Sequence, residues 1–119
     1  MKSAADILVA LVALLHVWFL VLEMFLWDKP LGLRTFRQTP ESAGTSKVLA
    51  ANQGLYNGFL AAGLLWGLWL GGAGFGIKLF FLGCVIVAGL FGAATVGRKI
   101  LFVQAFPAAI AMALVVAAS

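Results

Sequence analysis

Charged residues are scarce in this sequence: they make up 10% of the 119 residues, against about 25% in a typical soluble domain. Hydrophobic residues make up 64%, so the chain cannot cover an apolar core with a polar, water-facing surface. The net charge of +4 is scattered and forms no basic patch, which argues against nucleic acid as a partner. The single cysteine, Cys84, excludes an intrachain disulfide. These shortages predict an integral membrane protein whose first partner is the lipid bilayer.

Apolar segments of about 20 residues, the length that crosses a bilayer, recur along the chain. We expect membrane-spanning helices at about residues 4–27, 48–70, 77–96 and 100–118. The second helix can begin earlier, near Pro40, because Thr39 can cap it and proline suits the first helical position. The sequence therefore predicts an all-α fold, a single transmembrane domain over residues 1–119 built as a bundle of four transmembrane helices.

Basic side chains are unequally divided between the two sides of such a bundle. The connections at 28–47 and 97–99 carry most of them: Lys29, Arg34, Arg37, Lys47, Arg98 and Lys99. The other side has only Lys2 and Lys78. Short loops rich in lysine and arginine stay in the cytoplasm. We therefore expect these two connections inside the cell and both termini on the non-cytoplasmic side.

Four polar side chains interrupt the second span within "LAANQGLYNGF" (49–59): Asn52, Gln53, Tyr56 and Asn57. At about 100° per residue they occupy an arc of about 140°, with Gly54 and Gly58 beside it. Hydrocarbon offers such groups no partner. We expect all four to face one another and Glu23 across the bundle interior. The neighbouring glycines favour close helix contact, within the chain or in a homo-oligomer.

Glu23 is the residue that most favours a functional site, because an acidic group inside a membrane span is costly. His16 lies two helical turns earlier on the same face, and we expect this pair to hold or transfer a proton. At about 1.5 Å per residue, Gln104 falls in the same cytoplasm-side layer as Glu23.

Each of these residues also has a plainer interpretation. His16 can be a buried hydrogen-bonding partner, and Glu23 can be neutral or paired. Amides such as Gln104 can act as glue between helices, at about 0.6 kcal/mol per hydrogen bond. His16, Glu23 and Cys84 are a poor ligand set for a metal, so we expect neither a metal nor another cofactor.

Three functions remain open. In the first, a small, partly apolar molecule, such as a lipid-like or amphipathic ligand, is bound by Asn52, Gln53, Tyr56, Asn57 and Gln104. Glu23 and His16 would then process it by acid–base chemistry or only hold it, since no catalytic motif decides whether the protein is an enzyme. In the second, the chain is a subunit of a proton-coupled transporter or exporter of small molecules. In the third, it is a structural or assembly protein whose polar layer only locks the helices together.

Four segments resemble a small bacterial membrane-protein family known as domain of unknown function 1304. They are "LHVWFLVLEMFLW" (15–27), "KVLAANQGLYNGFLAAGL" (47–64), "FFLGCVIVAGLFGAATV" (80–96) and "KILFVQAFPA" (99–108). The resemblance implies a compact four-span protein with His16, Glu23, Asn52, Gln53, Tyr56, Asn57 and Gln104 at motif positions. It implies no substrate. We expect a multi-pass protein of the bacterial cytoplasmic (inner) membrane.

Overall fold

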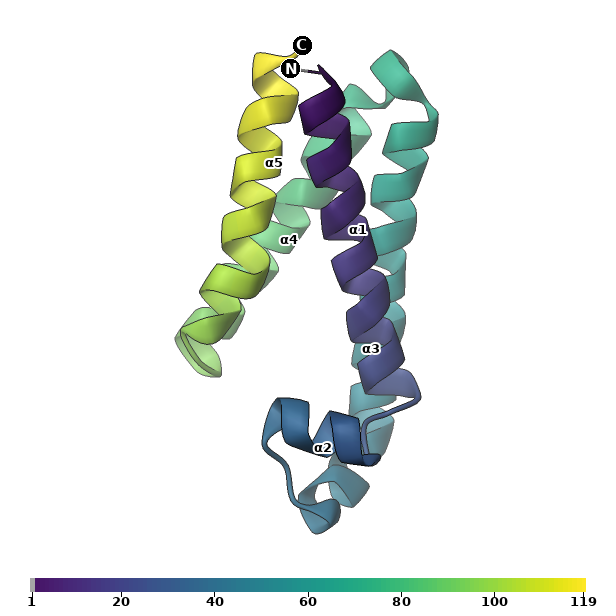
Figure 1. Ribbon diagram of the computed structural model, residues 1–119, viewed down its shortest axis with the longest axis vertical. Helices are drawn as coiled ribbons and strands as arrows, with labels where there is room; N and C mark the ends of the chain where they lie inside the picture. Colours follow the sequence, from purple (N-terminus) through teal and green to yellow (C-terminus); the bar gives the residue numbers. More distant parts are fainter. Residues whose placement is uncertain (1) are drawn as a thin grey trace. The chain divides into compact units, whose positions relative to one another are not determined.

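The computed structural model describes residues 2–119, and the part of the chain that it describes is all-α. The elements in Figure 1 are α1 (Lys2–Met24), α2 (Pro30–Phe36), α3 (Pro40–Trp69), the 3-10 turn η1 (Gly71–Gly74), α4 (Phe75–Thr95), the π-helical turn η2 (Leu101–Ala105) and α5 (Phe106–Ala117). The chain forms two compact units. One comprises the chain up to Leu14 together with Leu60–Ser119, and the other comprises Leu15–Phe59. The boundary between the units falls within α1 and within α3.

Two helices are long and apolar enough to cross a membrane among the residues described, Lys2–Met24 and Gly71–Thr95. Leu101–Ala117 is apolar but shorter. The 30 residues of α3 make it the longest helix, but the polar residues singled out in the sequence interrupt its middle. The all-α prediction is confirmed, and two of its helices have the length and apolarity of a membrane span.

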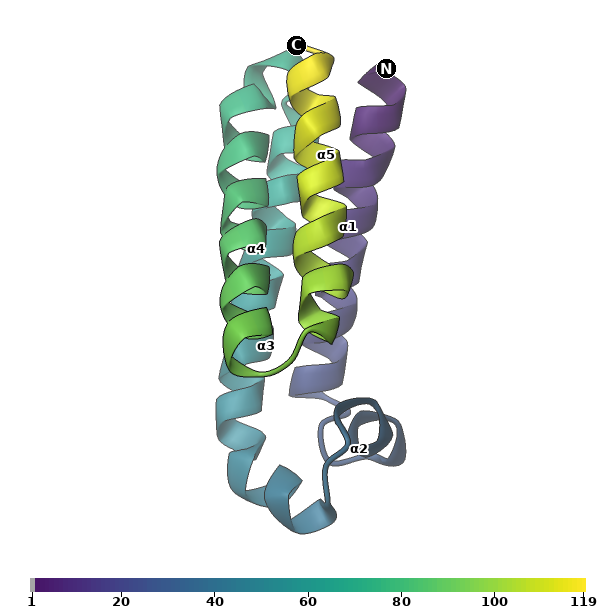
Figure 2. The ribbon, with the colours of Figure 1, turned by 90° about the vertical axis from the view of Figure 1, so that its left-hand side faces the viewer.

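Small side chains bring the helices of the larger unit together. Its fully buried residues are Val9 and Ala13 of α1, Leu64 of α3, Leu82 and Val85 of α4, and Ala108 and Ala111 of α5. Alanine at such positions lets helix backbones approach closely, and the valines and leucines fill the space between them. Figure 2 shows the result for α4 and α5, which run side by side in opposite directions.

The π-helical turn η2 lets α5 contain Pro107 near its start. The Phe106 N–H bonds to the Leu101 carbonyl, five residues earlier. Pro107 then lies within the first two positions of α5, where its missing N–H costs least. The turn packs on Gly89 of α4, because a Cβ there would lie 2.7 Å from the Ala105 Cβ. Gly89, one of the small residues of α4, is thus in contact with a turn of the same chain.

Two glycines make the tight connection between α3 and α4. Gly71 adopts a φ of 63°, a left-handed conformation that favours glycine. A Cβ on Gly74 would lie 2.0 Å from the Gly67 carbonyl oxygen, so the backbones of η1 and α3 touch directly. The chain can therefore reverse within a few residues and begin α4 at Phe75.

The smaller unit contains α2, in a stretch where the sequence predicts only a polar connection. Pro30 stands at the start of this helix, and Arg37 ends it with a φ of 52°. Gly32 is buried against the turn that follows α1, because a Cβ there would lie 1.8 Å from the Leu26 carbonyl oxygen. α2 is therefore held against the preceding turn by a contact that only glycine allows.

Reciprocal hydrogen bonds begin α3. The Ser42 N–H donates to Thr39 Oγ1 at 3.1 Å, and the Thr39 N–H donates to Ser42 Oγ at 3.2 Å. Such a capping box satisfies backbone donors that the first helical turn leaves without partners. With Pro40 at the first helical position, it starts α3 well before the apolar part of that helix.

Candidate functional site

Glu23 and Asn57 meet in the smaller unit, near the end of α1 and in the middle of α3. The Asn57 side-chain amide donates a hydrogen bond to Glu23 Oε1. Asn57 is only 7% exposed, whereas the Glu23 side chain is partly exposed. The structure thus joins two predicted site residues that lie 34 positions apart in the sequence.

Glycines on α3 create room for this contact. A Cβ on Gly54 would lie 2.6 Å from Met24 Cγ and 3.1 Å from Glu23 Cβ, and one on Gly58 would lie 2.7 Å from Leu20 Cδ1. The absence of these Cβ atoms lets α1 come close enough for the Glu23 carboxylate to reach Asn57. The interpretation of Gly54 as a packing residue is confirmed.

Asn52, Gln53 and Tyr56 do not face inward with Asn57. All three are exposed on α3, and the Tyr56 ring pairs with Phe59 at a centroid distance of 6.1 Å. The expectation that all four residues of the polar arc face Glu23 is therefore wrong. The assignment of Asn52, Gln53 and Tyr56 to ligand binding stays a prediction.

The angular positions on α3 explain this division. Counted at about 100° per residue, Asn57 stands at the end of the polar arc nearest Gly54, about 60° away, whereas Asn52 stands at the far end. The glycine face is the one that α1 covers. Asn57, the polar residue nearest that face, is therefore the one that contacts Glu23.

His16 lies on the same face of α1 as Glu23 and is fully buried. Its ring packs edge-on against Phe19, with centroids 5.2 Å apart and planes at 73°. Two helical turns, about 10 Å of rise, separate His16 from Glu23. Any proton exchange between the two would therefore need a ligand or water to bridge that rise.

Gln104 belongs to the larger unit, where it lies half-buried in the π-helical turn η2. A turn of this kind widens the helix locally and is frequent at functional sites. The assignment of Gln104 to the binding site stays a prediction from the sequence pattern.

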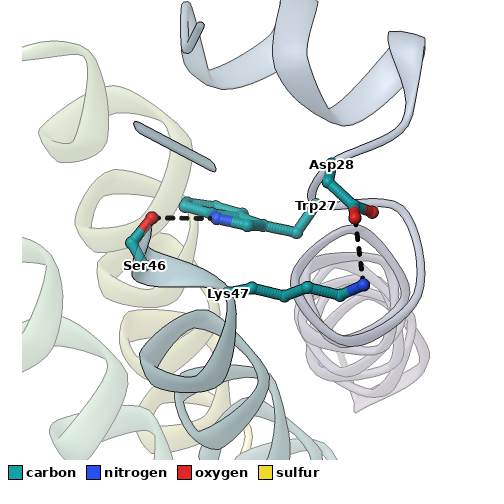
Figure 3. Close-up of polar contacts among 4 residues, drawn as sticks. All are labelled: Trp27, Asp28, Ser46 and Lys47. Atoms are coloured by element: carbon teal, nitrogen blue, oxygen red, sulfur yellow. Dashed lines mark hydrogen bonds and ion pairs between the residues drawn. The ribbon is translucent and has the colours of Figure 1, made fainter. Parts of the chain in front are cut away.

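Two further polar contacts tie the connection after α1 to α3, and sequence reasoning missed both (Figure 3). Trp27 Nε1 donates to Ser46 Oγ at 3.1 Å, and Lys47 Nζ pairs with Asp28 Oδ2 at 2.9 Å. The Trp27 ring also packs on Phe36 of α2, with centroids 4.8 Å apart. The ion pair could have been predicted from the opposite charges of Asp28 and Lys47 at the two ends of the connection.

The ion pair perturbs the aspartate. The hydrogen bond and positive charge of Lys47 hold the pKa of Asp28 below its usual value. Asp28 therefore stays ionised, and paired with Lys47, to lower pH than an ordinary aspartate. Because both side chains are accessible to solvent, the pair contributes little to stability and is weakened by salt.

Comparison with known proteins gives two matches. A family model described as "Protein of unknown function (DUF1304)" matches residues 10–116, a range that includes every residue of the predicted site. "Uncharacterized protein YpaA" of Lactococcus lactis subsp. lactis (strain IL1403) is 33% identical over 100 residues, which cover 82% of this chain and 84% of that protein. No solved structure matches the chain significantly.

Proposed function

The chain belongs to the DUF1304 family of proteins of unknown function, and we propose that it binds a small, partly apolar molecule within the membrane through Glu23. The observation that carries the proposal is the hydrogen bond from buried Asn57 to the partly exposed carboxylate of Glu23. The amide fixes the orientation of the carboxylate, and such a preoriented acidic group in an apolar helix is suited to binding.

The chemistry of the ligand follows from what Glu23 still has available. An ionised carboxylate has about four lone-pair sites, and the Asn57 bond uses one of them. A hydroxyl or ammonium group of the ligand would donate to the others. Leu20 and Met24, on the same part of α1, pack against Gly58 and Gly54 and remain partly exposed, so they border the carboxylate with apolar surface. A molecule with a hydrogen-bond-donating head and an apolar body fits this combination.

Acid–base processing of that molecule is the catalytic form of the same proposal. Glu23 would accept a proton from the donor head and return it, while Asn57 keeps the carboxylate in one orientation. His16 would serve as the second proton carrier, reached through the bound molecule. The assignment of Asn52, Gln53, Tyr56 and Gln104 to binding of the head rests on the sequence pattern alone.

The proposed setting is a four-span protein of the bacterial cytoplasmic membrane, with α1, the apolar part of α3, α4 and η2–α5 as the spans. Both termini would be non-cytoplasmic, because six basic residues lie in the 28–47 and 97–99 connections. In a Cys84→Ser background, an impermeant thiol reagent should label a cysteine in the 71–76 turn of intact cells and spare one at Ser46. The opposite labelling pattern would contradict this orientation.

The ligand test compares three proteins purified in mild detergent: wild type, Glu23→Gln and Glu41→Gln. Glu41 is an exposed acidic residue of α3 in the same unit, so its variant controls for the loss of one negative charge. Mass spectrometry of extracted small molecules should find an amphipathic compound in wild type and Glu41→Gln and lose it in Glu23→Gln. Equal retention by a folded Glu23→Gln protein would contradict binding at Glu23.

A structural role is the second candidate, and one observation favours it. The Glu23–Asn57 bond lies beside Gly54 and Gly58, where α1 and α3 are in close contact. If the bond only locks these helices, Asn57→Ala should lower the melting temperature and no extracted compound should depend on Glu23.

Transport would instead be indicated if reconstituted vesicles show proton movement that Glu23→Gln abolishes.

A further inference from the structure

The starts of α1 and α4 and the end of α5 lie at one end of the larger unit (Figures 1 and 2). Residues of these helix ends line a small cavity of about 170 Å³. Its charged lining residues are Lys2 and Asp6 of α1 and Lys78 of α4. By volume it has room for on the order of ten water molecules. The cavity contains none of the residues proposed above for ligand binding.

Lys78 is the unusual member of this group, because it is only 7% exposed. Its stem lies against α3, where a Cβ on Gly67 would come within 2.6 Å of Lys78 Cγ. A lysine is rarely buried to this degree unless its charge is compensated. The position of the side chain therefore calls for a negatively charged partner.

Asp6 supplies only part of that compensation. Its Oδ1 lies 3.8 Å from Lys78 Nζ, which is beyond hydrogen-bond distance, and its side chain is 44% exposed to solvent. Among residues 2–119, Asp6 is the acidic partner within ion-pair distance of Lys78. An ammonium group has three donors, and Lys2 adds a second positive charge to the cavity.

Helix ends add to this positive potential. The cavity is lined by Lys2 at the start of α1 and by Phe75 at the start of α4, and helix starts carry partial positive charge. The end of α5 at Val115 and Ala118, and the main-chain oxygens of Ser119 after it, offset part of this effect. With two ammonium groups against one carboxylate, the charged side chains of the lining sum to one net positive charge.

We propose that this cavity binds a phosphate group, held by Lys78 from inside the fold and by Lys2 from its rim. A tetrahedral oxyanion fits the cavity and accepts hydrogen bonds from both ammonium groups. Asp6 holds Lys78 in place when the site is empty and weakens binding through its own negative charge. The phosphate comes either from a phospholipid headgroup or from free phosphate in solution.

The first test measures phosphate binding directly, by the rise in melting temperature of the detergent-purified protein as inorganic phosphate replaces chloride at constant ionic strength. Wild type and Lys99→Gln should respond equally, because Lys99 is an exposed lysine of the same unit outside the cavity. Lys78→Gln and Lys2→Gln should lose or weaken the response. Lys2 is exposed, so its variant remains informative even if Lys78→Gln fails to fold.

Asp6→Asn separates a phosphate site from a simple ion pair. Removing the negative charge of Asp6, whose Oδ1 lies 3.8 Å from Lys78 Nζ, should raise the apparent affinity for phosphate about fivefold, the equivalent of about 1 kcal/mol. A Lys78–Asp6 pair with no ligand predicts only a lower melting temperature in this variant. Unchanged or weaker phosphate binding by Asp6→Asn would overturn the proposal.

Native mass spectrometry from nanodiscs of phosphatidylcholine and phosphatidylglycerol distinguishes the two sources. A retained phospholipid that phosphate displaces, and that Lys2→Gln loses, identifies a headgroup as the ligand. A response to inorganic phosphate without any retained lipid identifies free phosphate. The site is refuted if neither signal changes between wild type and Lys2→Gln.

Discussion

Truncation of Asn57 tests the contact on which the candidate site depends. Asn57→Ala removes the amide that donates to Glu23 Oε1 and leaves the carboxylate without that partner. Hydrogen bonds to charged groups contribute about 1.5–3 kcal/mol. In membrane proteins side-chain hydrogen bonds average about 0.6 kcal/mol, with values up to about 1.7. Because Glu23 is partly exposed, we expect a loss of about 1–1.5 kcal/mol in the free energy of unfolding.

Asn52→Ala is the matched control, since Asn52 is an exposed asparagine on the same helix. Its effect should stay within about 0.5 kcal/mol, as for most surface substitutions. Reversible unfolding by dodecyl sulfate in mixed micelles, followed by circular dichroism, measures both variants. A double-mutant cycle that adds Glu23→Ala should give a coupling energy of about 1 kcal/mol between Glu23 and Asn57.

Two results would refute this reasoning. Equal destabilisation by Asn57→Ala and Asn52→Ala would mean that burial and the hydrogen bond of Asn57 contribute nothing specific. A coupling energy indistinguishable from zero would mean that the Glu23–Asn57 contact is not formed in the folded protein. Either result would also remove the basis for a preoriented carboxylate at Glu23.

Three further predictions concern other parts of the fold. Gly54→Ala should cost about 1–2 kcal/mol of unfolding free energy, because its Cβ would lie 3.2 Å from a backbone oxygen of α1. Gly58→Ala should be near neutral: only the end of a leucine side chain must move, and alanine favours the helix by about 1 kcal/mol. Gly74→Ala should prevent the turn before α4 from closing, with a fall in melting temperature that Gly76→Ala does not share, because a Cβ at Gly76 would meet open space. Asp28 has a lowered pKa when folded, so the stability that its ion pair adds is present above the ordinary aspartate pKa of about 4 and is lost as pH falls below it through the lower pKa of the folded state. The difference in melting temperature between wild type and Asp28→Asn should therefore vanish in acid, and a constant difference across the pH range would contradict the assignment.

The helices could be predicted well from the sequence, and the exceptions have physical causes. Long apolar segments and the glycines at 71–76 mark the long helices and the break between α3 and α4, because these signals are local. α2 was missed although Pro30 offered a local signal for a helix start. The π-helical turn η2 was missed because it depends on the packing of Ala105 against Gly89 of another helix.

The sequence by itself determined that the chain is helical and apolar, and it singled out Glu23 and the polar arc of α3 as costly to bury. Chain composition and helical periodicity suffice for that, since both act through local geometry and solvation. Only the tertiary structure decided that Asn57, and neither Asn52 nor Tyr56, meets Glu23. The reason is steric: α1 packs on the face of α3 that lacks Cβ atoms at Gly54 and Gly58. Likewise, Lys78 and Asp6 lie 72 positions apart, and only the packing of the larger unit brings their charges to 3.8 Å.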